Sequence, residues 1–278
     1  MTRSSNKPLV SVIIPTYNRA WIVKEAIDSV LEQNFHDYEL IVVDDGSVDN
    51  TPTILKAYAK KIRVLRQPNQ GVSAARNRGI AAASGRLVSF LDSDDLWLPG
   101  KLSAQVKFFN DHPEAVINQT QERWIRNGVR VNPKNRHHKF SGMIFERSLA
   151  LCLVSPSAVM IKKSLFNTVG IFDENLPACE DYDLWLRISC RYPVHLIETP
   201  LIIKRGGHVD QLSKAAGLDK YRIQSLVKII ESDFLTKPQY QAALIALKEK
   251  CKVYAGGCRK RGREEEAKYF HTLAQKYG

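Results

Sequence analysis

The chain has 278 residues, of which 44% are hydrophobic and 25% are charged. This composition excludes a disordered, collagen-like or coiled-coil chain, and the length allows one large domain or a domain with an appendage. The 41 Lys and Arg residues outnumber the 29 Asp and Glu residues by 12, and such a surplus suggests an anionic partner: nucleic acid, a lipid surface or a phosphorylated ligand.

The positive charge is concentrated toward the C-terminus. Residues 201–278 hold 16 basic and 8 acidic side chains, which leaves 25 basic and 21 acidic side chains for residues 1–200. The first 200 residues are therefore nearly balanced, and the tail is the basic part of the chain.

The five cysteines argue against both a disulfide framework and a zinc site, because their number is odd and no two have C-x-x-C spacing. They fit a reducing compartment. The apolar runs are too short to span a bilayer, and Pro15 ends the first run before a signal-peptide core could form. We expect a soluble, cytoplasmic protein.

Short β-branched runs alternate with helical patterns over the first 110 residues. Strands are expected at 9–14, 39–43, 62–65 and 87–91, and helices at 22–31, from Pro52 onward, at 71–83 and at 99–109. This alternation predicts right-handed β-α-β units, and therefore an α/β fold with a mainly parallel sheet flanked by helices.

The second half of the chain changes character near residue 210. Before that point we expect strands at 115–124, 157–161 and 201–204, a polar basic loop at 132–139 and a helix at 181–189. After it, helices are expected at 218–231, 239–254 and 263–277, with a break at Gly256 and Gly257. We therefore expect one α/β domain over 1–212 and a C-terminal helical extension over 213–278.

Polar residues follow three of the expected strands, and the carboxyl ends of parallel strands are where such sheets bind ligands. The candidates are Pro15, Thr16 and Tyr17 after the first strand, Asp44 and Asp45 after the second, and Asp92, Ser93, Asp94 and Asp95 after the fourth. Closely packed carboxylates need a cation, a proton or solvent. Mg²⁺ and Mn²⁺ prefer one or two carboxylates together with diphosphate oxygens. The alternatives are a solvated loop in which Asp95 caps the next helix, and an ordinary Asp-Gly-Ser turn after Asp44.

Three further residues are candidates for chemistry. Arg76, near the start of a helix rich in small residues, suits a bidentate phosphate contact or the neutralisation of nearby aspartates. Asp181 lies at a helix N-terminus, where a carboxylate is stabilised in its ionised form as a cap or as a general base. His208 follows Gly206 and Gly207, so it is either structural or a ligand that reaches a metal.

In this order, these segments resemble the family 2 glycosyltransferases with the GT-A fold, over roughly residues 8–213. The resemblance rests on residues 10–18, 44–47, 71–77 and 90–95, the Glu180-Asp181 pair with Trp185, and the late His208. It implies transfer of a sugar from a nucleoside-diphosphate donor, with UDP favoured, to a saccharide, lipid-linked or other acceptor hydroxyl, with inversion. The chain lacks a Q-x-x-R-W segment after Glu180-Asp181, which favours addition of a single sugar over processive synthesis.

The resemblance also implies a role for each candidate residue. Pro15, Thr16 and Tyr17 would line the nucleobase and ribose pocket, Asp45 or else Asp44 would accept a hydrogen bond from the base, and Arg76 would lie near the nucleotide. Asp92 and Ser93 would face the ribose or sugar, Asp94, Asp95 and His208 would hold Mn²⁺ or Mg²⁺, and Asp181 would be the catalytic base.

Two other function classes fit parts of the sequence. A sugar nucleotidyltransferase would carry a Gly-rich basic loop after the first strand, where this chain has Pro15-Thr-Tyr-Asn18. A nucleic-acid binding module is disfavoured because the basic tail has no aromatic platform or recognition motif. Peripheral contact with an anionic membrane at the inner face, through the basic cluster at 256–263, remains compatible with transferase activity.

Overall fold

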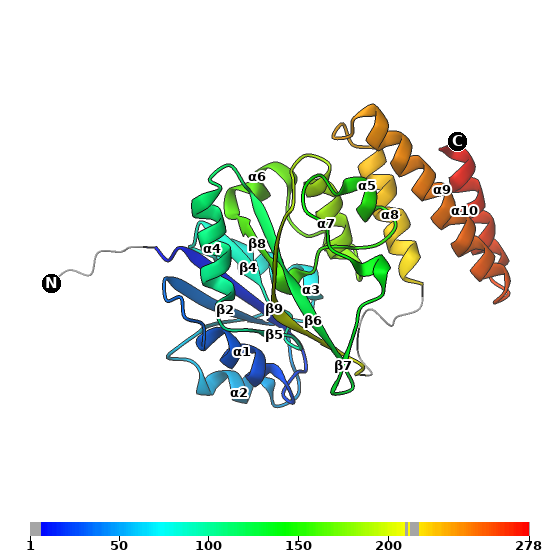
Figure 1. The fold of residues 1–278 in the computed structure, drawn as a ribbon. Coiled ribbons are helices and arrows are strands. Elements are labelled where there is room, and N and C mark those ends of the chain that lie inside the picture. The colour runs from blue at the N-terminus through cyan, green and yellow to red at the C-terminus, as the bar shows by residue number, and fades with distance from the viewer. Residues whose placement is uncertain (1–6, 209–210, 212–216, 278) are drawn as a thin grey trace.

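The computed structural model describes residues 7–208, 211 and 217–277. Nine strands of these residues form one sheet, in the order β3-β2-β1-β4-β8-β6-β9-β5, with β7 paired to β6 (Figure 1). The strands are β1 (Val10–Thr16), β2 (Tyr38–Asp44), β3 (Arg63–Arg66), β4 (Leu87–Phe90), β5 (Leu96–Trp97), β6 (Ile117–Arg126), β7 (Val129–Val131), β8 (Val159–Lys162) and β9 (His195–Gly206).

Helices cover the sheet and extend beyond it. They are α1 (Val23–Leu31), α2 (Thr51–Ala57), α3 (Val72–Ala82), α4 (Lys101–Asp111), α5 (Phe145–Ser148), α6 (Phe166–Val169), α7 (Glu180–Ser189), α8 (Leu218–Ile230), α9 (Lys237–Arg259) and α10 (Glu264–Lys276). None of the helices in the described residues is both long enough and apolar enough to cross a bilayer.

Parallel pairing dominates the sheet, as the sequence predicts. Strands β3, β2, β1 and β4 are parallel neighbours, and β6 pairs in parallel with β9 over most of its length. The antiparallel pairs that β4 and β6 make with β8 are short. The sheet is thus of the expected α/β type, with its mixed half formed by the later strands.

The strand β1 shows why the first strands are continuously apolar. Val12 and Ile14 face one hydrophobic cluster, with α1 and α4, whereas Ile13 faces the cluster that contains Ala75 of α3. Both faces of the sheet are covered, so both sets of alternating side chains are buried. A Cβ atom at Gly79 would lie 2.4 Å from Ile13 Cγ2, which explains why α3 needs small residues.

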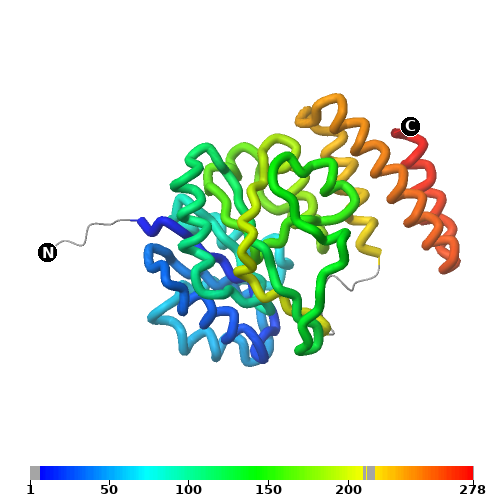
Figure 2. Tube along the Cα trace, viewed as in Figure 1, coloured from blue at the N-terminus to red at the C-terminus, as the bar shows by residue number. Residues whose placement is uncertain are grey.

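A third hydrophobic cluster joins the C-terminal helices to the α/β part. Tyr182 and Leu186 of α7 are buried in it together with Leu226 of α8 and Leu247 of α9. Figures 1 and 2 show α8 to α10 stacked outward from α7, on the side of the molecule away from α1 and α2. The expected domain boundary between residues 212 and 213 lies outside the described residues.

The expected helix break at Gly256 and Gly257 is wrong. Helix α9 continues through both glycines to Arg259. Each glycine costs a helix about 1 kcal/mol relative to alanine, but the flanking Ala255 and Cys258 are buried in the third cluster and hold this turn in place. The expected loop at 132–139 also contains a 3₁₀ turn at Asn135–His137.

Candidate active site

The ends of β1, β2 and β4 place the sequence-derived candidates at one edge of the sheet. Thr16 is paired with Asp44, and the Asp45 backbone N–H donates to the Thr16 carbonyl at 2.9 Å. Phe90, two residues before Asp92, is paired with Ile13 of β1. The loops that follow these strands are therefore neighbours, as the parallel topology requires.

Asp45 organises the loop that leads into α3. Its Oδ1 accepts hydrogen bonds from Gln67 Nε2 at 2.7 Å and from the Gln70 N–H at 3.0 Å, and its Oδ2 accepts one from the Gly71 N–H at 2.8 Å. Both oxygens of this expected base ligand are therefore already used to hold the 67–71 loop.

The other members of the expected nucleotide pocket differ in exposure. Asp44 is buried, with Oδ1 accepting from the Ser47 N–H at 2.9 Å and Oδ2 lying 3.4 Å from Arg66 Nε. Pro15 is buried, and Thr16 Oγ1 is a buried atom without a hydrogen-bond partner in the described part of the chain. Tyr17 is 44% exposed. Of these residues, only Tyr17 offers an open side chain to a ligand.

Arg76 of α3 joins two carboxylates from distant parts of the chain. Its Nη1 donates to Glu180 Oε1 at 2.5 Å and its Nη2 to Asp92 Oδ1 at 2.7 Å, and its Cζ lies 5.1 Å from the centre of the Phe172 ring. Burial raises the pKa of Glu180, and Arg76 partly offsets this effect. The guanidinium therefore neutralises nearby carboxylates, which is one of the two roles the sequence suggests for it.

The side chains of the acidic loop after β4 differ in burial. Asp95 is buried: its Oδ2 accepts from Ser157 Oγ at 2.7 Å and its Oδ1 from the Arg205 N–H at 2.8 Å. Burial, reinforced by Asp94 and Asp92, raises its pKa well above the ordinary value. Ser93 is also buried. The Asp95 side chain thus ties the loop to β9, as does the Asp94 backbone carbonyl, which accepts from Arg205 Nε at 2.5 Å.

Asp94 turns toward His208 instead. The distance from Asp94 Oδ2 to His208 Nε2 is 2.8 Å, and both side chains are partly open to solvent. The His208 ring makes an edge contact with Trp21 at 5.6 Å between ring centres. A carboxylate and an imidazole are a suitable donor pair for Mn²⁺ and a possible one for Mg²⁺.

Asp95 does not complete a three-residue metal site with this pair. In the part of the chain that the structure describes, no group of three or more His, Cys, Asp and Glu side chains is placed to hold a metal ion. Any cation bound by Asp94 and His208 would therefore take its other ligands from substrate oxygens and water.

Asp181 lies in the first turn of α7. Its Oδ1 accepts from the Tyr182 N–H at 2.7 Å, and its Oδ2 lies 3.5 Å from Cys152 Sγ. The preceding Cys179 has a left-handed backbone with φ of 61°. Asp181 is thus a carboxylate at the N-terminus of α7, next to the Cys152 thiol.

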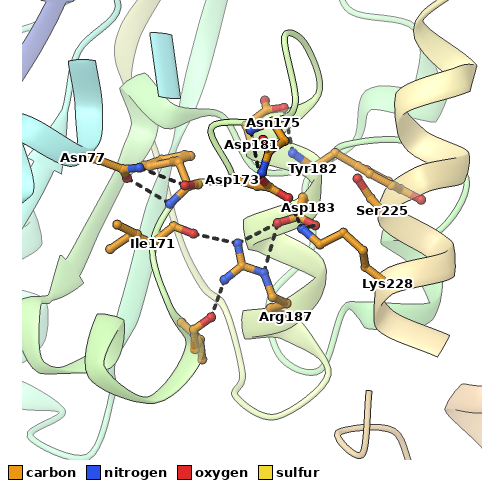
Figure 3. Close-up of polar contacts among 12 residues, drawn as sticks. Asn77, Ile171, Asp173, Asn175, Asp181, Tyr182, Asp183, Arg187, Ser225 and Lys228 are labelled. Atoms are coloured by element: carbon orange, nitrogen blue, oxygen red, sulfur yellow. Dashed lines mark hydrogen bonds and ion pairs between the residues drawn. The ribbon is translucent and has the colours of Figure 1, made fainter. Parts of the chain in front are cut away.

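An ion-pair network around the buried Asp183 holds α7 in position (Figure 3). Asp183 accepts from Arg187 Nε at 3.0 Å and Nη2 at 2.6 Å, and its other oxygen lies 2.8 Å from Lys228 Nζ of α8. Asn77 of α3 bonds to both the N–H and the carbonyl of Phe172, and Arg187 donates to the Ile171 carbonyl. The helix that carries Asp181 is therefore tied to α3 and α8.

Lys204 of β9 is a site residue that the sequence does not reveal. Burial alone would lower its pKa, but Glu122, Asp95, Asp92 and Asp181 raise it, so the ammonium stays charged. Its Nζ lies 3.4 Å from Ser155 Oγ. Lys204 faces these carboxylates because β9 pairs with β6, and no local pattern signals that pairing.

The strand β6 supplies a second buried ion pair beside Lys204. Lys139 Nζ lies 2.9 Å from Glu122 Oε2, and Trp124 Nε1 donates to Glu122 Oε1 at 2.7 Å. Burial would raise the pKa of Glu122, but Lys139, Lys204 and the indole N–H lower it to about 2. Lys139, part of the expected polar loop, is thus a buried structural cation.

A cavity of about 690 Å³ lies away from these residues. It is lined by Gly85, Leu87, Lys162 and Ser164, among others, at the amino end of β4. Asp92 follows the carboxyl end of the same strand, so the cavity and the acidic loop lie at opposite edges of the sheet.

Comparison with known proteins agrees with this geometry. The family model described as glycosyl transferase family 2 matches residues 11–170. An uncharacterized glycosyltransferase of Rickettsia felis is 35% identical over 218 residues, which cover 74% of this chain and 35% of that protein. The chain thus spans about a third of the length of this relative.

Two solved structures share the fold. TarS of S. aureus residues 1–349, in complex with UDP-GlcNAc, matches with a TM-score of 0.69 and 18% identity over 96% of this chain and 91% of that one. The mannosyltransferase PcManGT of Pyrobaculum calidifontis, in complex with GDP-Man and Mn²⁺, matches with a TM-score of 0.59 and 20% identity over 98% and 81%. The fold is thus the GT-A type, and the match to more than half of the chain shows that it belongs to glycosyl transferase family 2.

Proposed function

We propose that this protein transfers a single sugar from a nucleoside-diphosphate sugar, with UDP favoured, to an acceptor hydroxyl with inversion. The observation that carries the proposal is the meeting of Asp94 with His208 at the same sheet edge as Asp92, which Arg76 links to the start of α7. The diphosphate would thus bind beside the candidate base, and the Arg76 contacts would hold the two in position.

The donor nucleotide is assigned to the ends of β1 and β2. We place the nucleobase against the exposed Tyr17 ring, with Pro15 and Thr16 beside the ribose. Asp45, or else Asp44, would lie at the base edge, and Asp45 also shapes the 67–71 loop through its hydrogen bonds. The UDP-GlcNAc complex of the structural neighbour TarS supports a UDP-linked donor.

The sugar and the diphosphate are assigned to the acidic loop. Asp92, fixed by Arg76, and the neighbouring Ser93 would lie beside the ribose or sugar. Asp94 and His208 would hold Mn²⁺ or Mg²⁺, which when bound supplies positive charge to the departing diphosphate. The Mn²⁺ in the PcManGT complex supports this assignment. Asp95 would keep the loop in place through Ser157 and Arg205.

Asp181 is assigned as the catalytic base. A carboxylate is too weak a base to deprotonate a free hydroxyl outright. It accepts the proton as the acceptor oxygen attacks the anomeric carbon and becomes more acidic. Direct attack on the carbon that the diphosphate leaves inverts its configuration. The contacts of the buried Asp183 with Arg187 and Lys228 would keep this base in place.

The C-terminal helices are assigned to peripheral contact with an anionic membrane, from a cytoplasmic location. Arg259, Lys260, Arg261 and Arg263 form an exposed basic cluster at the end of α9 and the following turn. Each basic side chain near an anionic surface contributes about 1 kcal/mol to binding. A lipid-linked acceptor would be accessible to an enzyme attached in this way.

Thermal shift measurements test the donor and metal assignments. UDP-, GDP- and dTDP-sugars are compared with and without Mn²⁺ on the wild type, on Asp94→Ala, and on Asp111→Ala as a surface-carboxylate control. We expect metal-dependent stabilisation by a UDP-sugar that Asp94→Ala loses and Asp111→Ala keeps. Equal nucleotide stabilisation in all three proteins, or none in the wild type, would refute the proposal.

A further inference from the structure

The hairpin of β6 and β7, with the loop that follows it, carries an unusual excess of positive charge. Residues 123–139, here called the basic hairpin, contain six basic side chains and no Asp or Glu: Arg123, Arg126, Arg130, Lys134, Arg136 and Lys139. This charge lies outside the C-terminal tail, and the donor site makes no use of it.

The basic hairpin borders the proposed active site. Strand β6 pairs with β9 so that Trp124 lies opposite Lys204, and Arg126 opposite Gly206, two residues before His208. Lys204 in turn faces the Asp92 and Asp181 carboxylates. The paired strands β6 and β9 therefore connect the basic hairpin with the Asp94–His208 pair and with Asp181.

Trp124 organises the inner face of the hairpin. Arg126 Cζ lies 4.8 Å from the centre of the Trp124 ring, Lys204 Nζ lies 5.8 Å from it, and the His137 ring is 5.0 Å away. The Arg126 Nη1 atom is buried and has no hydrogen-bond partner among the residues that the structure describes. The Arg126 guanidinium thus contacts the Trp124 ring but keeps one N–H group that could donate to a ligand.

Most of the hairpin charge has no partner within the described part of the chain. Lys139 is paired with Glu122, but Arg123, Arg130, Lys134 and Arg136 are exposed and form no ion pair with a described carboxylate. Elsewhere, cations such as Arg187 and Lys228 are matched by nearby aspartates. Unmatched like charges on one short hairpin repel one another, so a bound anion would relieve that repulsion.

We infer that the basic hairpin is an acceptor subsite for an anionic saccharide, one that carries phosphate or carboxylate groups close to the accepting hydroxyl. The inference rests on the proposed transfer function, because Asp181 defines where the hydroxyl must lie. A neutral acceptor would gain nothing from these cations, whereas an anionic one is attracted and oriented by them. The charges of the hairpin would thus select the acceptor, whereas Asp181 would only take the proton of the accepting hydroxyl.

Binding of defined polymers tests the subsite. The probes are polygalacturonate oligomers for carboxylates, dextran phosphate for phosphates, and neutral dextran. The hairpin variant combines Arg123→Gln, Arg130→Gln and Arg136→Gln, all at exposed positions. The matched control combines Lys237→Gln, Lys248→Gln and Lys252→Gln, which removes three exposed charges from α9 outside the basic cluster at its end.

We expect the wild type to bind at least one anionic polymer, more weakly as salt increases, and to ignore neutral dextran. The hairpin variant should lose about tenfold in affinity and show a flatter salt dependence, because fewer counterions are released. The control variant should bind as the wild type does. Binding of only one anionic polymer identifies the charged group that the subsite prefers.

Three results would overturn the inference: equal losses in both triple variants, equal binding of neutral dextran, or no binding of either anionic polymer by the wild type. Binding to vesicles that contain phosphatidylglycerol is measured separately. If the hairpin variant loses vesicle binding but binds the polymers as the wild type does, the hairpin is a membrane contact instead. Stabilisation by UDP-sugar and Mn²⁺ is measured on the same proteins. Its retention in the hairpin variant shows an intact donor site, and its absence from the wild type counts against the proposed function instead.

Discussion

His208 and Asp94 lie 114 residues apart in the sequence, yet His208 Nε2 is 2.8 Å from Asp94 Oδ2. The strand β9 brings the histidine to the acidic loop, because β5 pairs with β9 directly after that loop, with Leu96 opposite Ile203. The pairing of a two-residue strand thus closes the candidate metal site.

Replacing His208 with alanine tests this pair. We expect His208→Ala to weaken Mn²⁺-dependent stabilisation by the donor at least about tenfold, the range in which losses around metal sites fall. The exposed His36→Ala serves as the control. Titration of Mn²⁺ at a fixed concentration of UDP-sugar, followed by melting temperature, gives the apparent affinity. An unchanged affinity in His208→Ala would remove this residue from the metal site.

The assignment of Asp181 as the base predicts a separation of binding from turnover. Asp181→Asn keeps the size of the side chain and removes its ability to accept the proton, so we expect kcat to fall about 10²- to 10⁴-fold. Donor binding should change little, because the donor contacts are assigned to other loops. Isothermal titration with UDP-sugar and a coupled assay for UDP release measure the two quantities. Turnover near that of the wild type would show that another group takes the proton.

The Arg76 bridge predicts a large and specific effect on stability. In Arg76→Met, the buried Glu180 and its neighbour Asp92 lose their shared cation, and we expect the free energy of unfolding to fall by about 3–5 kcal/mol. Adding Glu180→Gln should recover part of this loss, because it removes the uncompensated buried charge. Urea unfolding of the single and double variants gives both values. If the double variant is as unstable as the sum of the two single variants, the bridge is not the cause.

Lys101 predicts a pH dependence of stability. Its Nζ is buried beside Ser89 Oγ at 3.0 Å and Gln105 Oε1 at 2.5 Å, with the Trp97 ring centre at 3.8 Å, and burial lowers its pKa well below the ordinary value. Between its folded and unfolded pKa values, the unfolded chain binds one more proton, so the free energy of unfolding rises with pH.

Lys101→Met removes this dependence. From about pH 7 to pH 9.5 we expect the wild type to gain stability relative to the variant, by up to about 1.4 kcal/mol per pH unit within the titration range. The exposed Lys107→Met is the control. Urea unfolding at several pH values measures the difference, and parallel curves for the wild type and Lys101→Met would contradict it.

The continuous helix α9 predicts that one glycine is dispensable. A Cβ atom at Gly256 would meet no atom within 4 Å, so Gly256→Ala should stabilise the protein by about 1 kcal/mol. Gly79→Ala, where the new atom would lie 2.4 Å from Ile13 Cγ2, should destabilise it. Thermal melts of both variants provide the comparison. A loss of stability in Gly256→Ala would indicate that α9 bends there in solution.

The local sequence was sufficient for the α/β pattern and for the loops at the carboxyl ends of the strands. Apolar runs and helical spacing repeat over a few residues, and right-handed crossovers leave few ways to order such strands. The sequence alone therefore places Tyr17, Asp45, Asp92 and Asp94 at one edge of the sheet. The prediction of a helix break at Gly256 is wrong, because burial of the flanking residues outweighs the intrinsic cost of glycine in a helix.

The tertiary structure decided which of these polar groups are open to a ligand. Asp94 and Asp95 are adjacent in the sequence, but Asp95 is buried by Ser157 and Arg205, which lie 62 and 110 residues away, while Asp94 meets His208. Lys204 faces the carboxylates only because β9 pairs with β6. A residue type and its spacing determine what chemistry a side chain can perform. The hydrogen-bond partners of a carboxylate come from distant segments of the chain. Only the folded chain therefore determines whether that carboxylate can bind a ligand.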